Sequence, residues 1–303
     1  MKKLIYILPI IALTFIGCDK VDDPYPVLLD DGSTIVIDPS LGITVADLAN
    51  INWTTVEGTP TTKRNTVIEE FTGARCTFCP NGSKVLVQLD TLYGEQVIPV
   101  SIHAGNFAEP QPDSTKPFFL DLRLPVEAGE SVSKGETYLT TFNPAKAYPR
   151  GIVSRLTAEA ENQSKWRAEV DAVKDDAMKA KIDLDVMFAE SDDLIRIVID
   201  YEFMEESQLV HDLQVYIIEN HIIGWQLDNG TAKEFYDHKY VLRRVLNGLW
   251  GITAEPAVLG EVYHKEYVIR KEKNWDSNNL KAIVFIADRE TQEIIQANQT
   301  PVR

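Results

Sequence analysis

The C-terminal part of the chain contains a series of short β-rich runs, and this pattern restricts the fold more than any other feature. The run IDLDVMF at residues 182–188 alternates apolar and polar side chains, as a strand with one buried face does. Similar runs occupy residues 194–203, 213–218, 261–269 and 280–288. Turn-forming pairs such as Asn229-Gly230 separate the runs. We predict a β-rich C-terminal domain at residues 178–303, mostly antiparallel and sandwich-like.

A different pattern occupies residues 43–177, where strands and helices are expected to alternate. The runs TVIEEF at 66–71 and VIPVSI at 97–102 are typical of strands. Between them, Val85, Leu89 and Leu92 fall on one predicted helical face. Further β and helical patterns lie at residues 152–156 and 164–177. This order favours an α/β domain, interrupted by a Pro- and Gly-containing insertion near residues 104–143.

The N-terminus, MKKLIYILPIIALTFIGCDK, resembles a bacterial lipoprotein signal. Lys2 and Lys3 precede an apolar run that ends at Gly17 and is short for a permanent membrane span. We predict a lipoprotein signal peptide at residues 1–17 and lipid attachment at Cys18. The alternative is an ordinary signal peptide followed by an unrelated cysteine. Because two or more acyl chains anchor a protein stably, a lipid bilayer is an expected partner.

Residues 18–42 are rich in Asp, Pro and Gly and are predicted to form a flexible tether. The acidic residues after Cys18 resemble the surface-export signal of Bacteroidota lipoproteins. The chain has 46 acidic and 30 basic residues and a net charge of −16. Such a surface repels nucleic acid, so no nucleic-acid partner is expected.

The segment EEFTGARCTFCPNG contains the two remaining cysteines, Cys76 and Cys79. Export places this pair outside the cytosol, where disulfides persist. A disulfide across C-x-x-C would stabilise the fold by only about 2 kcal/mol, because the closed loop is short. A zinc site would need further ligands, and the five histidines lack ligand-like spacing. We therefore expect no metal and no cofactor, although His103, at the end of a predicted strand, could approach the pair.

Redox chemistry agrees better with the local pattern. A strand leads into a short turn, and a helix is expected to begin at or near Cys76. The helix N-terminus and the positive charge of Arg75 would stabilise a thiolate and lower its pKa from about 8.5 to about 3.5–7.5. Cys76 is then the expected nucleophile, and Cys79 the resolving thiol.

VIEEFTGARCTFC also resembles the strand, turn and C-x-x-C helix of the thioredoxin superfamily. That resemblance implies that Glu70 is the buried acid that moves the proton of the resolving thiol. It also implies that Pro149, in AYPRGIV, is a cis-proline that faces the cysteines. The sequence departs from the usual WCGPC, because Thr77-Phe78 separates the cysteines here, and this leaves the direction of electron flow open.

More of the chain resembles a narrower family, the outer membrane protein 28 related lipoproteins of Bacteroidota. The resemblance rests on EEFTGARCTFCPNG, AYPRGIVSR, YDHKYVLRRVLNGLWG and VFIADRETQEIIQAN, in that order. It implies an outer membrane lipoprotein on the periplasmic or cell-surface side. The implied fold class is an α/β thioredoxin-like domain followed by a mostly antiparallel β-sandwich-like domain.

Two functions follow from these patterns. The first is thiol–disulfide exchange on secreted or envelope proteins, with protein thiols or disulfides as partners. The second is a non-catalytic surface module that binds a partner and keeps the C-x-x-C as a structural disulfide. Fold alone does not separate them, and whether the protein is an enzyme stays open at this point. The aromatic and charged segment at residues 235–244 is expected to be strand packing with a solvated face.

Overall fold

The computed structural model describes residues 27–28, 34–110 and 120–303. The predicted signal peptide, Cys18 and most of the tether lie outside the described residues. Strands hold 41% of the described residues and helices 18%. No helix within these ranges has the length and apolar character needed to cross a membrane.

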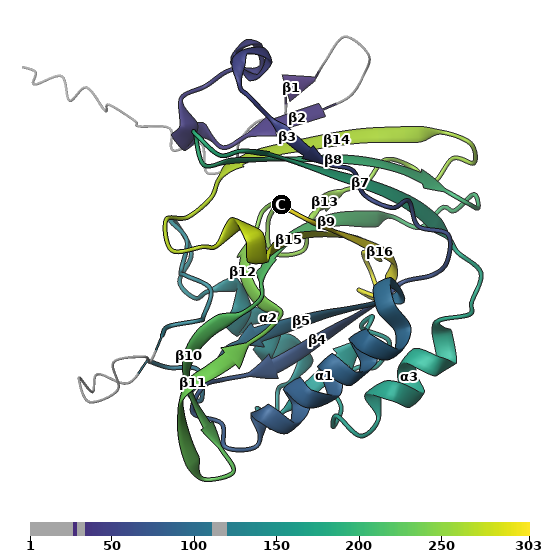
Figure 1. The fold of residues 1–303 in the computed structure, drawn as a ribbon. Helices are drawn as coiled ribbons and strands as arrows, with labels where there is room; N and C mark the ends of the chain where they lie inside the picture. The colour runs from purple at the N-terminus through teal and green to yellow at the C-terminus, as the bar shows by residue number, and fades with distance from the viewer. Residues whose placement is uncertain (1–26, 29–33, 111–119) are drawn as a thin grey trace, which may run out of the picture.

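The strands of the described residues form a six-stranded sheet, an eight-stranded sheet and a two-stranded hairpin (Figure 1). The six-stranded sheet has the order β1 (Val27–Leu28), β2 (Thr34–Ile37), β14 (Val262–Arg270), β8 (Leu194–Phe203), β7 (Ala180–Ala189) and β3 (Thr54–Val56). The eight-stranded sheet has the order β16 (Ile294–Pro301), β15 (Leu280–Asp288), β9 (His211–Glu219), β12 (Val241–Val245), β5 (Val97–His103), β4 (Thr66–Thr72) and β6 (Arg150–Val153), and β13 (Ile252–Thr253) pairs with β9. The hairpin consists of β10 (Ile222–Asp228) and β11 (Thr231–His238).

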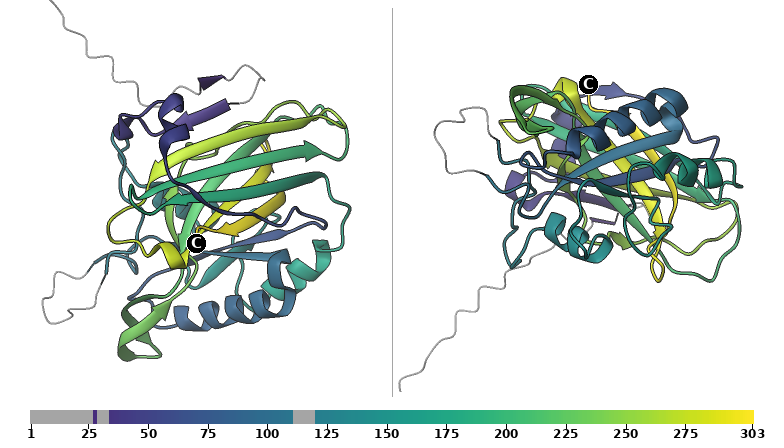
Figure 2. Two further views of the ribbon diagram at one scale, coloured as in Figure 1. Left: turned by 45° about the horizontal axis from the view of Figure 1, so that its top comes forward. Right: turned by 90° about the horizontal axis from the view of Figure 1, so that it is seen from below.

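Three α-helices pack beside the eight-stranded sheet: α1 (Cys79–Tyr93), α2 (Lys134–Phe142) and α3 (Trp166–Val173). Short 3-10 helices lie at Pro39–Leu41, Val45–Asn50, Gly94–Gln96 and Ser277–Asn279. Figures 1 and 2 show α1 and α3 on the side of the molecule that faces away from the six-stranded sheet.

The alternation that predicted a strand at residues 182–188 is confirmed by β7. Ile182, Leu184 and Val186 are fully buried, whereas the aspartates between them are only partly buried. β7 pairs antiparallel with β8, and β8 pairs antiparallel with β14. The apolar side chains of β7 and β8 join one hydrophobic cluster with residues of β9 and β15. Two sheets therefore pack face to face in this part of the molecule.

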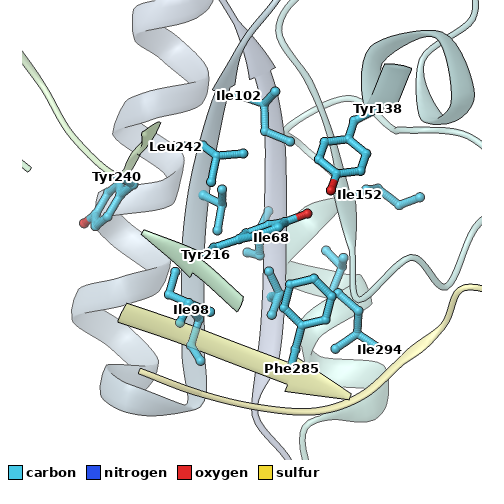
Figure 3. Close-up of a cluster of buried hydrophobic side chains, with 14 of the residues drawn as sticks. Ile68, Ile98, Ile102, Tyr138, Ile152, Tyr216, Tyr240, Leu242, Phe285 and Ile294 are labelled. Carbon is cyan, nitrogen blue, oxygen red and sulfur yellow. The ribbon is translucent and has the colours of Figure 1, made fainter. Parts of the chain in front are cut away.

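Strand β9 is buried on both faces, which explains why it lacks alternation. Leu213, Val215 and Ile217 belong to the cluster shared with the six-stranded sheet. Tyr216 and Ile218 belong to the second large cluster, which contains residues of all three helices. Figure 3 shows Tyr216 in that second cluster, beside side chains from β4, β5 and β15. A strand covered on both faces has a nearly continuous apolar sequence.

The expected fold class, an α/β thioredoxin-like domain followed by a mostly antiparallel β-sandwich-like domain, is wrong. Strands predominate over helices, and the eight-stranded sheet is mixed and takes strands from both parts of the chain. β4 and β5 are parallel, β5 meets β12 at the pair Ser101 and Val241, and β12 continues the sheet to β9. A separate α/β domain is not evident in the described residues. The domain limits stay a prediction, with residue 178 falling between α3 and β7.

The helical patterns predicted the elements but not all of their faces. In α1, Leu89 is buried as expected, but Leu92 is 54% exposed and Leu86 is buried instead. The expected position of Leu92 on the buried face is therefore wrong. In α3, Trp166 and Val170 are buried, but the helix ends at Val173, short of residue 177, where the helical pattern was expected to end. The helical part of the expected insertion is α2, whose Tyr138 is buried in the cluster of Figure 3.

Candidate functional site

Cys76 and Cys79 form a disulfide in the turn between β4 and α1. The helix begins at Cys79 and is preceded by Phe78 at the N-cap, so it starts later than the expected position at or near Cys76. The amide of Cys79 donates to the carbonyl of Cys76 over 3.3 Å. Cys76 is 3% exposed and Cys79 1% exposed, so the disulfide is closed off from solvent in this conformation.

The β10–β11 hairpin lies directly against this turn, as Figure 1 shows beside the start of α1. The amide of Leu227 donates to the carbonyl of Ala74 over 2.8 Å, and the amide of Asn229 donates to the carbonyl of Thr77 over 2.8 Å. The amide of Gly230 also donates to Oγ1 of Thr77 over 2.6 Å. The hairpin therefore extends the C-x-x-C turn through backbone hydrogen bonds, as a neighbouring strand would.

Gln226 strengthens this contact with its side chain, which is 3% exposed. Its Nε2 donates to the carbonyl of Cys76 over 3.0 Å and to that of Gly73 over 3.4 Å. The same atom lies 2.9 Å from the carbonyl of Leu227. One buried amide thus satisfies carbonyl groups on both sides of the contact, which would otherwise be costly to bury.

On its other side the turn packs against residues 106–109. A Cβ atom on Gly73 would lie 2.4 Å from the carbonyl carbon of Phe107, so only glycine allows this approach. The amide of Arg75 donates to the carbonyl of Phe107 over 2.9 Å. The guanidinium of Arg75 lies 3.4 Å from the carbonyl of Asn106 and 3.9 Å from a carboxylate oxygen of Glu109. The expected action of Arg75 on Cys76 stays a prediction.

Glu69 and Glu70 are neighbours in β4 and point to opposite faces of the strand, as successive strand residues do. Glu69 accepts hydrogen bonds from Arg155 Nε over 2.7 Å and Arg155 Nη2 over 2.9 Å. Tyr216 donates to Glu69 Oε1 over 3.2 Å. Arg155 and Glu69 are each 1% exposed, so Glu69 belongs to a closed, paired structural cluster.

Glu70 is buried without a charged partner. Ser101 Oγ donates to Glu70 Oε2 over 3.2 Å, and Oε1 has no hydrogen-bond partner among the described residues. Burial raises the pKa of Glu70 to about 8, and the hydrogen bond from Ser101 opposes this shift. A carboxyl group with such a pKa is able to take up or release a proton near neutral pH.

The structure brings Glu70, Gly82 and Pro149 together. The Tyr148-Pro149 peptide bond is cis. A Cβ atom on Gly82 would lie 2.2 Å from Glu70 Oε1 and 2.9 Å from Pro149 Cβ. Since Gly82 lies in the first turn of α1, one residue after Asn81, these groups meet beneath the helix end that carries Cys79. The side chain of Tyr148 donates to the carbonyl of Ala104 over 2.9 Å.

His103 is also close to the site region, at the end of β5. Its ring lies 5.6 Å from the ring of His238, at the end of β11. Burial lowers the pKa of His103 well below its usual value and lowers that of His238 to about 4. Among the described residues no group of three or more His, Cys, Asp or Glu side chains is arranged to hold a metal. The role of His103 stays a prediction.

The sequence reading missed the contribution of the hairpin to this site. Asn229-Gly230 was expected only as a turn between β-rich runs, and β10 was not predicted. Nothing in the sequence connected that hairpin to cysteines about 150 residues earlier, because the contact depends on a sheet that joins both parts of the chain. Gln226 therefore carried no recognisable signal.

The profile of one protein family, described as outer membrane protein Omp28, matches residues 136–303. The matched range begins after the C-x-x-C, so both cysteines of the disulfide lie outside it. No curated protein sequence matches the chain significantly.

Among solved structures, the chain is similar to HBP35 of Porphyromonas gingivalis, with 16% identity and a TM-score of 0.57 over 80% of this chain and 76% of that one. A protein from Agrobacterium tumefaciens matches with 13% identity and a TM-score of 0.49, over 80% and 96% of the two chains. A domain of the outer membrane lipoprotein Omp28 from Porphyromonas gingivalis matches with 19% identity and a TM-score of 0.29, over 42% and 91%. At this identity the first match indicates a shared fold only.

Proposed function

The chain belongs to the outer membrane protein Omp28 family, and we propose that it carries out thiol–disulfide exchange through Cys76 and Cys79. Family membership confirms the expected location as an outer membrane lipoprotein. The proposed partners are thiols or disulfides of secreted or envelope proteins. The proposed anchor is acylated Cys18, which lies outside the described residues.

The proposed reaction is a reversible exchange of one disulfide for another. A substrate thiolate attacks Cys76 Sγ, the Cys76–Cys79 bond breaks, and Cys79 leaves as a thiolate. The second substrate thiolate then attacks the substrate sulfur of the mixed disulfide and releases Cys76. The substrate ends as a disulfide and the protein as a dithiol, and the reverse sequence oxidises the protein. The intact disulfide between residues only three apart supports this proposal.

Glu70 gives the proposal its strongest support, because burying a carboxyl group without a charged partner costs free energy. Its contact region, shared with Gly82 and Pro149, lies beneath the first turn of α1. We assign it the proton that the Cys79 thiolate takes up when the disulfide opens, and that the Cys79 thiol releases when the disulfide closes. A pKa of about 8 would let the carboxyl group act in either direction.

The second candidate is a binding module in which the disulfide is structural. The burial of both sulfur-bearing residues, at 3% and 1% exposure, favours it. In that case the disulfide would fix the turn on which the hairpin rests and would not exchange.

A redox titration of the full chain, with alkylation of the reduced thiols, separates the two candidates. For exchange we expect a reversible couple above about −300 mV. In addition, Cys79→Ser should trap a mixed disulfide with a cysteine-containing peptide at Cys76, whereas Cys76→Ser should trap much less. A couple below that potential, with no trapped species in Cys79→Ser, contradicts exchange and leaves the structural disulfide.

A further inference from the structure

We propose that the β10–β11 hairpin covers the Cys76–Cys79 disulfide, that it must move away before a thiol can reach the sulfur atoms, and that Gln226 holds it closed. This inference rests on the proposed exchange for its biological purpose. Its physical content, the control of access to the disulfide, can be measured separately.

The need for movement follows from burial. Thiol–disulfide exchange requires an attacking sulfur to reach a disulfide sulfur directly. Cys76 and Cys79 are 3% and 1% exposed, which leaves no approach for a thiolate carried by another protein. Exchange therefore requires a second conformation in which one of the segments around the turn has moved.

The hairpin is better suited to this movement than the rest of the site. In the described residues β11 pairs only with β10, outside both larger sheets. Residues 231–234 at the distal end of β11 are exposed, whereas the other end of the strand packs through His238 against His103 of β5. Only the distal part of the outer strand therefore has little packing to lose. An isolated two-stranded hairpin is only marginally stable in water. The hydrogen bonds from β10 and its turn to the C-x-x-C turn therefore hold the hairpin in place.

The base of the hairpin supplies a fixed point for the movement. Tyr240 donates through its amide to Asn220 Oδ1 over 2.8 Å and through its hydroxyl to Asp90 Oδ2 over 2.8 Å. His221 and Tyr240 have φ values of 57° and 56°, so the chain bends sharply where the hairpin begins and ends. The base stays attached to α1 through Asp90, while the distal part is held by the contact with the turn.

Gln226 adds side-chain hydrogen bonds to the backbone hydrogen bonds across this contact. Its amide donates to the carbonyl groups of Cys76 and Gly73, which are on the turn, from a position on the hairpin. Gln226→Met keeps the length of the side chain and removes both donors. Losing them should shift the equilibrium toward the open hairpin by about tenfold, since one or two net hydrogen bonds are lost.

The test is the rate at which a water-soluble phosphine reduces the disulfide in the folded full chain. The phosphine attacks one sulfur, the S–S bond breaks, and water completes the reaction to give a phosphine oxide and two thiols. Gln214→Met is the matched control, because Gln214 is 1% exposed and donates to Asn247 Oδ1 over 2.9 Å and to the carbonyl of Gly248 over 3.1 Å. Gln214 lies in β9, away from the turn, and its buried side-chain amide likewise donates to two acceptors.

We expect Gln226→Met to be reduced about tenfold faster than the wild-type protein, and Gln214→Met to be reduced at the wild-type rate. Equal rates in the wild-type protein and Gln226→Met, or an equal increase in both variants, overturn the proposal. Hydrogen exchange in the unmodified protein gives a second measurement. The amides of Leu227 and Asn229 should exchange in step with the reduction rate as temperature is varied, and protection that persists while the disulfide is reduced also overturns it.

The two proposals can fail separately. Faster reduction of Gln226→Met together with a couple below about −300 mV leaves the hairpin as a cover and removes exchange as the function. A higher potential and a trapped mixed disulfide, with no effect of Gln226→Met, leave exchange and remove the hairpin as the controlling element.

Discussion

Replacing Glu70 with glutamine should stabilise the protein relative to wild type, by an amount that increases as the pH rises. The pKa of Glu70 is about 8 in the folded protein, against 4.5 for an unperturbed glutamate. Between these values the unfolded chain has lost the proton and the folded protein has kept it, so the folded state binds more protons and its stability falls with pH. Each pH unit above the unfolded pKa costs about 1.4 kcal/mol, which gives about 3 kcal/mol at pH 7. Glu70→Gln removes this cost.

The assay is urea unfolding of the oxidised wild-type protein and Glu70→Gln between pH 4.5 and 8. We expect the free energy of unfolding of the variant, relative to wild type, to rise by about 3 kcal/mol from pH 4.5 to 7 and to level off near pH 8. Any fixed cost of placing an amide beside Ser101 shifts the whole curve without changing its slope. A difference that is flat across this range refutes the reasoning.

Glu69→Gln is the matched control, because it makes the same change at the next residue. Glu69 is bound to Arg155 and Tyr216, so the change leaves the buried guanidinium unpaired. A loss of about 3–5 kcal/mol is expected. Near pH 7, a gain in the free energy of unfolding for Glu70→Gln and a loss for Glu69→Gln would distinguish the unpaired carboxyl group from the paired one.

Two further substitutions test the packing and the charge pattern. Gly82→Ala should lower the free energy of unfolding in urea by about 1–3 kcal/mol, because the new Cβ would lie 2.2 Å from Glu70 Oε1; a gain, as expected for alanine in an open helix, would contradict that packing. Although partial burial opposes the shift, hydrogen bonds to Glu266 and Asp200 raise the pKa of His264. The stabilising contribution of protonated His264 should be complete below the unfolded pKa of about 6.5 and disappear as the pH rises through the folded pKa. His264→Gln should therefore lower the free energy of unfolding by about 1 kcal/mol or less at pH 5.5 and leave it unchanged at pH 9. An equal loss at both pH values would contradict this prediction.

The sequence predicted many elements correctly and failed on how they associate. Periodicity located β7 and β8, because a strand with one buried face leaves a two-residue repeat. A nearly continuous apolar run located β15, which is buried on both faces. Periodicity predicted the helix α1, but the helix begins at Cys79, three residues after Cys76, and Leu92 was placed on the wrong side. It also assigned the two parts of the chain to separate folds, because backbone pairing between β5 and β12 leaves no trace in side-chain pattern.

The residues of the candidate site were also predicted only in part. Cys76 and Cys79 could be identified from spacing and composition alone, since the chemistry of a C-x-x-C depends on the residues themselves. The residue pattern alone could not choose between Glu69 and Glu70, and only the resemblance assigned Glu70. Both residues lie in one strand, and the neighbouring elements determine which face carries a partner. Arg155, from the loop after β6, pairs with one and leaves the other alone.

By itself, the sequence determined the disulfide-forming pair, the family-specific motifs and the location of most strands, because these depend on residue identity and short-range spacing. Only the tertiary structure decided that a hairpin from the second half of the chain covers the C-x-x-C turn. That contact arises because one eight-stranded sheet joins both halves of the chain. Sheet order is set by backbone hydrogen bonds between distant segments, which all residues except proline can form in the same way.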